Sequence, residues 1–318
     1  MKIVVLDGRT LAPQREAWSG LDRFGELVYH DVSMPDEVAA RAAGATILAT
    51  NKTPLGQDLL DSLPELRFIT VLATGFDCVD IAAARRRGIP VSNVPVYGTD
   101  TVAQYVFALL LEMCHHVVLH AEAVKAGEWT RQPDFSMRKT RLRELVGKTM
   151  GIVGYGRIGR RTGELAHAFG MNVLACGHGT ASAVAETLAV SCQLDELFAR
   201  SDVISLHCPL TPKTAGLVNR ERLKLVKSDA FLINTARGGL IVEADLAQAL
   251  NTGRLAGAAV DVVSKEPVRA ENPLLAARNC LVTPHIAWAT DEARGRLMET
   301  TVANVAAFLA GAPINVVN

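Results

Sequence analysis

The stretch Met150-Gly151-Ile152-Val153-Gly154-Tyr155-Gly156-Arg157-Ile158-Gly159 decides the fold. Its apolar first half predicts a buried strand over residues 148–153, and Leu165 and Phe169 continue a helical apolar pattern that starts at Ile158. A strand that ends in a glycine turn and starts a helix directs free backbone N–H groups, with the positive end of the helix dipole, at a diphosphate. The stretch therefore predicts a dinucleotide-binding turn, and a glycine turn without a ligand is the alternative. The expected dinucleotide contacts in this turn are Gly154, Gly156, Arg157, Ile158 and Gly159.

Short apolar segments alternate with helical or turn-rich segments on both sides of this turn. Before it, strands are predicted at residues 2–6, 26–29, 46–49, 68–72 and 90–92. After it, strands are predicted at residues 172–176, 203–207, 230–234, 257–262 and 280–283, with helices at 220–226 and 243–250 between them. This alternation predicts an α/β fold with parallel sheets and crossover helices.

The length of 318 residues and the hydrophobic content of 49% suit two domains. A helix predicted at 291–309, with apolar Leu297, Val302 and Val305 on it, has no following strand to support. We therefore expect the chain to return to its first domain at the end. Two α/β domains joined by two crossings would leave a cleft in which a cofactor on one meets a substrate on the other.

The charge balance excludes some classes of partner. Lys+Arg and Asp+Glu are each 33, so the formal net charge is zero, and the chain has no overall electrostatic reason to bind nucleic acid or an anionic membrane. The basic runs at 85–87 and 138–143 are short and lack interleaved aromatic residues, which favours a solvated face or a subunit contact.

Several further patterns bear on localisation and metal binding. The six cysteines form no C-x-x-C pair, which indicates small apolar residues in a reducing compartment. The N-terminal apolar run is too short for a signal peptide, and the polar side chains in a helix predicted over 102–119 do not suit a bilayer span. His116 and His120 have i, i+4 spacing on that helix, but no H-E-x-x-H pattern accompanies them, so no metal is predicted. We expect a soluble, cytoplasmic protein.

Three residues that suit acid–base chemistry follow predicted strands in the second half of the chain. Arg237 follows an apolar strand and precedes two glycines, and its planar guanidinium suits a carboxylate; a surface loop arginine is the alternative. Glu266 and His285 also follow strands, and a carboxylate beside a histidine gives an acid or base that works near neutral pH. A buried structural histidine is the alternative for His285.

Two more strand ends are candidates for ligand contacts. His207 ends a strand, where it either lines the cofactor site or has a structural role. Gly75, after Thr74 in the first half, would let backbone N–H groups turn towards an anion, and a simple β-turn is the alternative.

The order of these motifs resembles the D-2-hydroxyacid dehydrogenase family. The motifs are Gly154-x-Gly156-x-x-Gly159, His207-Cys-Pro-Leu-Thr-Pro212, Asn234-Thr-Ala-Arg-Gly-Gly239, Asp261-Val with Glu266-Pro267, and Pro284-His285-Ile286. The resemblance covers nearly the whole chain. The segments Tyr97-Gly98-Thr99, Lys125-Ala-Gly-Glu-Trp129 and His285-Ile-Ala-Trp-Ala-Thr290 are most similar to the glycerate dehydrogenase or hydroxypyruvate reductase branch.

The resemblance implies a central Rossmann NAD(P)-binding domain, residues 99–286, and a flavodoxin-like substrate domain built from residues 1–98 and 287–318. It also implies a homodimer formed largely through residues 101–145. The implied catalytic residues are Arg237, Glu266 and His285, with Thr74 and Gly75 binding the substrate carboxylate beside Arg237 and His285. The further implied cofactor contacts are Gly177, His178, His207, Pro209, Thr235, Ala236 and Asp261, the last on the nicotinamide carboxamide.

One position departs from the family pattern. An NAD-selective fingerprint expects an acidic residue about 20 positions after the first glycines, where it binds the ribose hydroxyls. Gly177 stands there, with no Asp or Glu beside it; His178 and Thr180 are weak candidates for holding a 2′-phosphate. NAD(H) and NADP(H) both remain open as cofactors, with a lean towards tolerance of NADP(H).

The sequence thus predicts an NAD(P)H-dependent reductase of a small 2-oxo acid such as hydroxypyruvate or glyoxylate. Other members of the family, such as phosphoglycerate or phosphonate dehydrogenase, are the alternatives among enzymes. A dinucleotide-sensing, corepressor-like binding protein is the alternative from a different class.

Overall fold

The computed structural model describes residues 1–318 except 13, 178–183 and 185–186. The described chain divides into two compact units, unit 1 with residues 1–98 and 289–318, and unit 2 with residues 99–288. The chain returns to unit 1 at residue 289, two residues after the boundary of 287 expected from the sequence. Each unit contains one parallel sheet covered by helices on both faces, which confirms the predicted fold class of two doubly wound α/β domains.

Unit 1 has a five-stranded parallel sheet in the order β2-β1-β3-β4-β5. Its strands are β1 (Lys2–Val5), β2 (Glu26–Tyr29), β3 (Ile47–Thr50), β4 (Phe68–Val71) and β5 (Val91–Ser92). β3 and β4 are buried on both faces, which explains their continuous apolar sequence. This strand order is that of the flavodoxin-like doubly wound fold, so ligands are expected at the carboxyl ends of its strands.

The two faces of the unit 1 sheet have different covers. One face packs against the short helices α1 (Val38–Ala42), α2 (Gln57–Asp61) and α3 (Ile81–Arg86). The other lies against the 3-10 helix η1 (Arg15–Phe24) and the last helix α11 (Asp291–Leu309), where Phe68 of β4 stacks on Phe308 with ring centroids 4.5 Å apart. The expected return of the last helix to the first domain is therefore present.

Unit 2 has a seven-stranded parallel sheet in the order β12-β11-β10-β9-β6-β7-β8. The strands are β6 (Thr149–Val153), β7 (Asn172–Cys176), β8 (Ala189–Ser191), β9 (Val203–Leu206), β10 (Phe231–Asn234), β11 (Gly257–Val260) and β12 (Cys280–Val282). The first six strands in chain order have the Rossmann arrangement, and β12 adds a seventh beside β11. β8 was not predicted, because its three residues form no apolar run.

Two hydrophobic clusters pack on opposite faces of the unit 2 sheet. One contains α4 (Thr99–His115) and α6 (Arg157–Ala168). The other contains α8 (Leu194–Arg200), α9 (Arg220–Leu223) and α10 (Glu243–Asn251). The short 3-10 helices η3 (Gly238–Leu240) and η4 (Pro273–Ala276) complete this unit. The sheet is thus covered on both faces, as its parallel strands require.

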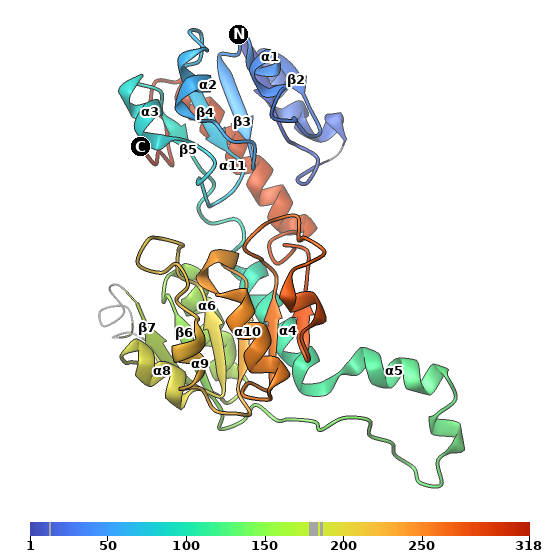
Figure 1. The fold of residues 1–318 in the computed structure, drawn as a ribbon. Helices are drawn as coiled ribbons and strands as arrows, with labels where there is room; N and C mark the ends of the chain where they lie inside the picture. The colour runs from blue at the N-terminus through green and yellow to red at the C-terminus, as the bar shows by residue number, and fades with distance from the viewer. Residues whose placement is uncertain (13, 178–183, 185–186) are drawn as a thin grey trace. The chain divides into compact units, whose positions relative to one another are not determined.

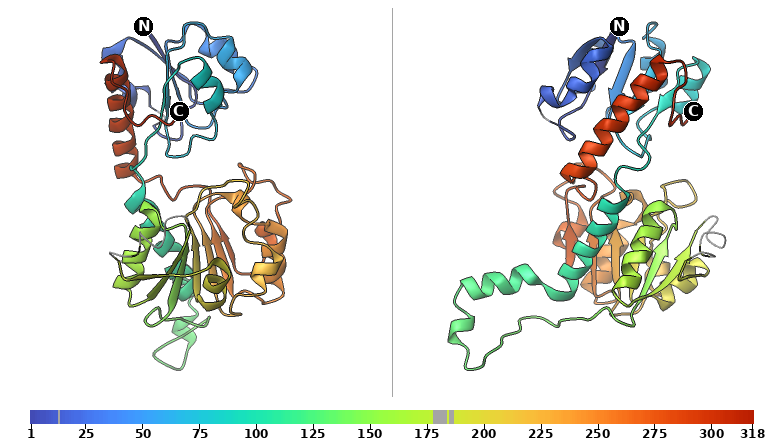
Figure 2. Two further views of the ribbon diagram at one scale, coloured as in Figure 1. Left: turned by 90° about the vertical axis from the view of Figure 1, so that its left-hand side faces the viewer. Right: turned by 180° about the vertical axis from the view of Figure 1, so that it is seen from behind.

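An arm, residues 116–143, extends from unit 2 (Figures 1 and 2). It contains α5 (Val117–Lys125) and η2 (Trp129–Arg131) and returns to the sheet without further regular structure. The predicted helix over 102–119 was wrong at its end, because His116 adopts left-handed backbone dihedrals, φ 47°, which stop α4 and start α5 in a new direction. Among the described residues no single helix has the length and hydropathy of a membrane span; α4 and α5 pass only as a pair bent by 54°.

Candidate active site

The predicted motifs of unit 2 meet at the carboxyl edge of its sheet. The direction of strand addition reverses at β6, which lies between β7 and β9, and such a switch point is where open α/β sheets bind ligands. The glycine turn directly follows β6, and His207 directly follows β9. The two are joined by a hydrogen bond, in which the N–H of His207 donates to the carbonyl oxygen of Val153 at 2.7 Å.

The three fingerprint glycines meet three different structural needs. Gly154 has φ +96°, and a Cβ on it would lie 2.5 Å from the backbone nitrogen of Cys208. A Cβ on Gly159 would lie 2.2 Å from the carbonyl oxygen of Gly154, so α6 packs closely against the turn. Gly156 is the N-cap of α6, and within the described chain nothing lies within 4 Å of a Cβ placed on it. The turn therefore fits a diphosphate, since the uncapped N–H groups at the start of α6 adjoin open space.

His207 follows β9 and Thr235 follows β10 at the same carboxyl edge of the sheet. Nε2 of His207 is 2.9 Å from Oγ of Ser205, and burial lowers the pKa of His207 to about 4, so its imidazole is neutral at pH 7. Oγ1 of Thr235 is buried and has no hydrogen-bond partner among the described residues. A bound dinucleotide is the kind of partner that would satisfy this hydroxyl. Pro209 is exposed and Ala236 half-buried.

The ribose end of the predicted site is described only in part. Gly177 follows β7 with φ +149° and is exposed, whereas His178 and Thr180 lie outside the described residues. The structure adds one cation here that the sequence motif did not indicate. Burial raises the pKa of Cys176, the last residue of β7, and the positive charge of Arg222 on α9 opposes that shift. Arg222 is held by Asp195, with Nε donating to Oδ1 at 3.0 Å, and by the carbonyl oxygen of Leu217, to which Nη1 donates at 2.7 Å.

Arg237 is presented by a loop that the buried Asn234 holds. The side chain of Asn234 donates from Nδ2 to the carbonyl oxygen of Arg237 at 2.9 Å and accepts at Oδ1 from the N–H of Ala236 at 3.0 Å. A Cβ on Gly238 would lie 1.9 Å from the backbone of Val263, so glycine lets this loop pack against the segment after β11. Arg237 is half-buried, with Nη1 donating to the carbonyl oxygen of Ala236 at 2.8 Å.

Asp261 is 1% exposed and organises the backbone around His285. Its Oδ1 accepts from Oγ1 of Thr283 at 2.7 Å and from the N–H of Ile286 at 2.9 Å, and its Oδ2 accepts from the N–H of Ala287 at 2.8 Å. Its carbonyl oxygen accepts from the N–H of His285 at 2.8 Å. Burial raises the pKa of this carboxyl group, and the hydrogen bonds from the backbone oppose the shift. The contact with the nicotinamide carboxamide implied for Asp261 stays a prediction.

Glu266 and His285 are in direct contact. Nδ1 of His285 lies 2.7 Å from Oε2 of Glu266, and the two side chains are 26% and 35% exposed. Oε1 of Glu266 accepts from the N–H of Val263 at 3.3 Å, which holds the carboxylate in place. The contact leaves Nε2 as the ring nitrogen through which His285 can exchange a proton.

In unit 1, Thr74 and Gly75 follow β4 at the carboxyl edge of the sheet, and a chain of asparagines supports them. Asn93 donates from Nδ2 to the carbonyl oxygen of Thr74 at 2.7 Å. Asn304 of α11, fully buried, donates to the carbonyl oxygen of Asn93 at 2.9 Å and accepts from Asn315 at 2.8 Å. The final segment of the chain thus holds the loop predicted to bind the substrate carboxylate. The sequence did not point to these asparagines, whose contacts span up to 211 positions.

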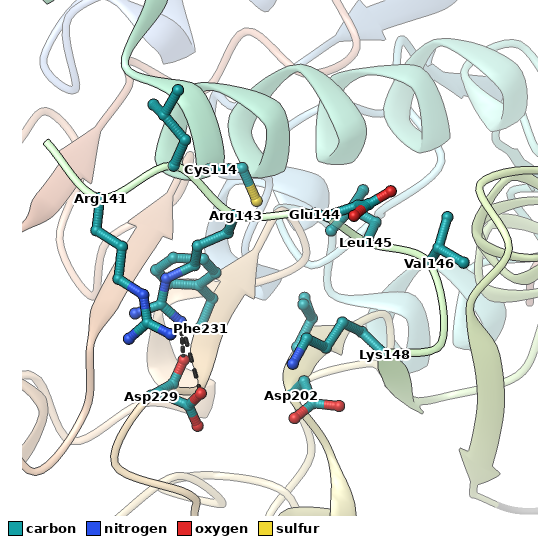
Figure 3. Close-up of a pocket in the computed structure, with 12 residues that line it drawn as sticks. Cys114, Arg141, Arg143, Glu144, Leu145, Val146, Lys148, Asp202, Asp229 and Phe231 are labelled. Carbon is teal, nitrogen blue, oxygen red and sulfur yellow. Dashed lines mark hydrogen bonds and ion pairs between the residues drawn. The ribbon is translucent and has the colours of Figure 1, made fainter. Parts of the chain in front are cut away.

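The structure also has a cavity away from this edge. A cavity of about 290 Å³ lies at the opposite, amino end of the unit 2 strands, lined by residues that include Lys148, Asp202 and Asp229 (Figure 3). There the guanidinium of Arg143 lies 4.6 Å from the ring centroid of Phe231 and 4.0 Å from the Asp229 carboxylate. Within the described residues no group of three or more His, Cys, Asp or Glu side chains is placed to hold a metal ion.

Comparison with known proteins agrees with this geometry. Residues 107–287 match the family model described as D-isomer specific 2-hydroxyacid dehydrogenase, NAD binding domain. The chain is 50% identical over 321 residues to a hydroxypyruvate reductase of Blautia hydrogenotrophica, with all of both chains covered. It is 40% identical to a glycerate dehydrogenase of Methylorubrum extorquens, covering 99% of this chain and 98% of that protein.

The fold is also that of solved enzymes. An NADPH-dependent glyoxylate/hydroxypyruvate reductase from Sinorhizobium meliloti, in complex with NADP and malonate, superposes with a TM-score of 0.86. It is 27% identical, and the match covers 99% of this chain and 96% of that one. The motif order, the fold and the matches over the full length agree, and the chain belongs to the D-isomer specific 2-hydroxyacid dehydrogenase family, with its NAD binding domain in unit 2.

Proposed function

We propose that the protein reduces a small 2-oxo acid, hydroxypyruvate or glyoxylate, to the D-2-hydroxy acid with NADH or NADPH. The observation that carries the proposal is the 2.7 Å contact between His285 and Glu266 at the carboxyl edge of the dinucleotide-binding sheet. The relative at 50% identity is a hydroxypyruvate reductase, which supports the choice of substrate.

The residues at this edge account for the proton and the charge that the reaction requires. The reduced nicotinamide, when bound, supplies a hydride to C2 of the substrate. His285, protonated and paired with Glu266, delivers a proton from Nε2 to the oxygen on C2, and such general acid catalysis contributes roughly 10²- to 10⁴-fold. Arg237 binds the carboxylate and stabilises negative charge that develops on that oxygen. Thr74 and Gly75 offer backbone N–H groups to the same carboxylate.

The cofactor proposal includes NADPH. Gly177 brings no negative charge to the ribose, so this position does not repel a 2′-phosphate. Arg222 on α9, which is paired with Asp195 at 3.0 Å, is the cation that we propose to reach such a phosphate. The Sinorhizobium meliloti reductase is NADPH-dependent, which is in line with this proposal.

We also propose that the enzyme is a homodimer that pairs through the arm. The arm exposes large apolar side chains, including Val118 at 64% and Phe135 at 87%. It is internally ordered, since Lys139 binds Glu128 at 2.7 Å and Nε1 of Trp129 donates to the carbonyl oxygen of Phe135 at 3.1 Å. An ordered segment with this much exposed apolar surface suits contact with another protein surface, and a second copy is the occupant that the family resemblance implies.

The six free cysteines suit a reducing compartment, and we propose a cytoplasmic location on that basis. The balanced formal charge supports a small-molecule reaction without nucleic acid or a membrane as a partner.

The test is oxidation of NADH and of NADPH with hydroxypyruvate, glyoxylate, pyruvate and phosphohydroxypyruvate. We expect turnover with hydroxypyruvate and glyoxylate, and a loss of about 10²- to 10⁴-fold in kcat for His285→Ala with little change in dinucleotide affinity. Preference for phosphohydroxypyruvate would favour a phosphoglycerate dehydrogenase. Dinucleotide binding without turnover on any 2-oxo acid would overturn the proposal and favour a sensing role.

A further inference from the structure

Asp7 follows the first strand of unit 1 and binds the loop that follows β3. Its Oδ1 accepts from the N–H of Asn51 at 2.8 Å, and its Oδ2 accepts from the N–H groups of Lys52 at 2.6 Å and Thr53 at 2.8 Å. Hydrogen bonds to an ionised acceptor are roughly twice as strong as neutral ones. One carboxylate with three consecutive backbone donors therefore fixes the backbone on both sides of Lys52.

The neighbours of Lys52 are tied inward, whereas Lys52 is exposed. Asn51 and Thr53 are 8% and 6% exposed. Nδ2 of Asn51 donates to Oγ1 of Thr10 at 2.9 Å, and the carbonyl oxygen of Thr53 accepts from Oγ1 of Thr50 at 3.0 Å. In the part of the chain that the structure describes, no carboxylate forms an ion pair with the Lys52 ammonium group. The loop thus presents an available positive charge on a fixed backbone.

This charge lies beside the loop predicted to bind the substrate. β3 and β4 are paired in register, with Thr50 opposite Val71, so the Lys52 loop and the loop of Thr74 and Gly75 leave the same edge of the sheet. The N–H of Leu55 donates to the carbonyl oxygen of Cys78 at 2.7 Å, which joins the two loops again further on.

Cys78 does not neutralise the ammonium group. Burial raises the pKa of the Cys78 thiol to about 11; the charge of Asp7 adds to the shift and that of Lys52 opposes it. The thiol is therefore neutral at pH 7, and the positive charge of Lys52 stays available to a ligand at the carboxyl edge, where sheets of this order bind ligands.

We propose that Lys52 recognises an oxygen on C3 of the 2-oxo acid, and that Asp7 is its positioning residue. This inference rests on the proposed function, in which Arg237, Thr74 and Gly75 bind the carboxylate and His285 serves the oxygen on C2. The one oxygen of hydroxypyruvate to which that proposal assigns no partner is the hydroxyl oxygen on C3. An ammonium group has three rotatable donors, so it suits a single hydroxyl or an anionic oxygen rather than a planar pair. Glyoxylate has no C3 and pyruvate has a methyl group there, so Lys52 would favour hydroxypyruvate over both.

The experiment compares kcat/KM of Lys52→Met and of the wild-type enzyme for hydroxypyruvate, pyruvate and glyoxylate at saturating NADPH. Methionine keeps the unbranched stem and removes the charge. We expect hydroxypyruvate to lose roughly 10- to 100-fold, as for removal of a charged hydrogen-bond partner, mainly through KM. The ratio of hydroxypyruvate to pyruvate should fall by the same factor, and Lys52→Arg should restore part of it.

Lys2→Met is the matched control. Lys2 lies at the amino end of β1, where Nζ donates to the carbonyl oxygen of Ala43 at 2.8 Å, so its replacement should leave the ratio unchanged. Equal losses on all three substrates would place the Lys52 ammonium group at the shared carboxylate and would overturn the inference. A ratio of hydroxypyruvate to pyruvate that Lys52→Met leaves unchanged, in an enzyme that still reduces these acids, would overturn this inference and leave the proposed function standing. A wild-type enzyme inactive on all three substrates would overturn the proposed function as well.

Discussion

His285 contacts Glu266 through Nδ1 at 2.7 Å while its own backbone is held in the left-handed region, with φ +56°. A histidine adopts that conformation at a cost, so the surrounding contacts must stabilise it. The buried Asp261 provides them by binding the backbone of residues 285–287 on both sides of the strained position. The two carboxylates therefore position different parts of His285, since Asp261 fixes its main chain and Glu266 orients its imidazole ring.

Glu266→Gln should lower kcat for 2-oxo acid reduction by roughly 10- to 100-fold, because a neutral amide stabilises the imidazolium form of His285 less than a carboxylate does. Steady-state kinetics with saturating cofactor measure the effect, and KM for the dinucleotide should not change. Glu271→Gln, on an exposed side chain, is the control. An unchanged kcat in Glu266→Gln would contradict the role of this pair.

Gly156→Ala should leave the fold intact and weaken dinucleotide binding. The residue has φ −80°, which alanine adopts freely, and its Cβ would enter the open space expected to hold the diphosphate. Gly154→Ala should instead lower the thermal unfolding midpoint, because φ is +96° and the Cβ would clash with Cys208. Fluorescence titration and thermal melts separate the two effects. Tight binding by a folded Gly156→Ala protein would argue against the diphosphate cradle.

Gly177→Asp should raise KM for NADPH more than KM for NADH, since a carboxylate there would repel a 2′-phosphate and accept hydrogen bonds from a ribose. Arg222→Gln should also weaken NADPH selectively, because it removes the positive charge that reaches the end of β7. Both are measured as the ratio of kcat/KM for the two cofactors. Equal changes in kcat/KM for NADPH and for NADH would show that neither residue lies at the ribose.

Phe135→Asp should convert the proposed dimer to a monomer. A charge at the most exposed apolar side chain of the arm would be buried unpaired if two copies met there. Sedimentation velocity measures the change in mass, and Val190→Asp, on the exposed edge strand β8, is the matched control. A monomeric wild-type protein, or a dimeric Phe135→Asp variant, would contradict the proposed interface.

The free energy of unfolding should decrease as the pH falls from about 6.5 towards about 4, because His207 titrates differently in the folded and unfolded chains. Burial lowers the pKa of this histidine to about 4, so the unfolded chain binds a proton that the folded chain rejects in this range. Urea unfolding at several pH values should show a steeper acid-side decline for the wild-type protein than for His207→Gln. Curves that stay parallel would show that His207 does not titrate differently on unfolding.

Much of the fold was predictable because buried parallel strands have continuous apolar sequence, as in residues 68–72 and 230–234. The break between α4 and α5 was not, since both helices have apolar sequence and the break depends on the backbone dihedrals of one residue, His116. The contact between Glu266 and His285 could be predicted only through the family motifs. The hydrogen bonds of Asp7 with residues 51–53 span 44 to 46 positions and follow from strand pairing, which no local pattern reveals.

The division of unit 1 between the two ends of the chain determines the order in which the protein can mature on the ribosome. Unit 2 is one continuous segment, residues 99–288, so it can form its whole sheet before residues 289–318 are synthesised. Unit 1 cannot, because Phe68 lacks its stacking partner on α11, and Asn93 lacks Asn304, until the last segment of the chain emerges. Unit 2 can therefore form before the loop of Thr74 and Gly75 gains its support from Asn304.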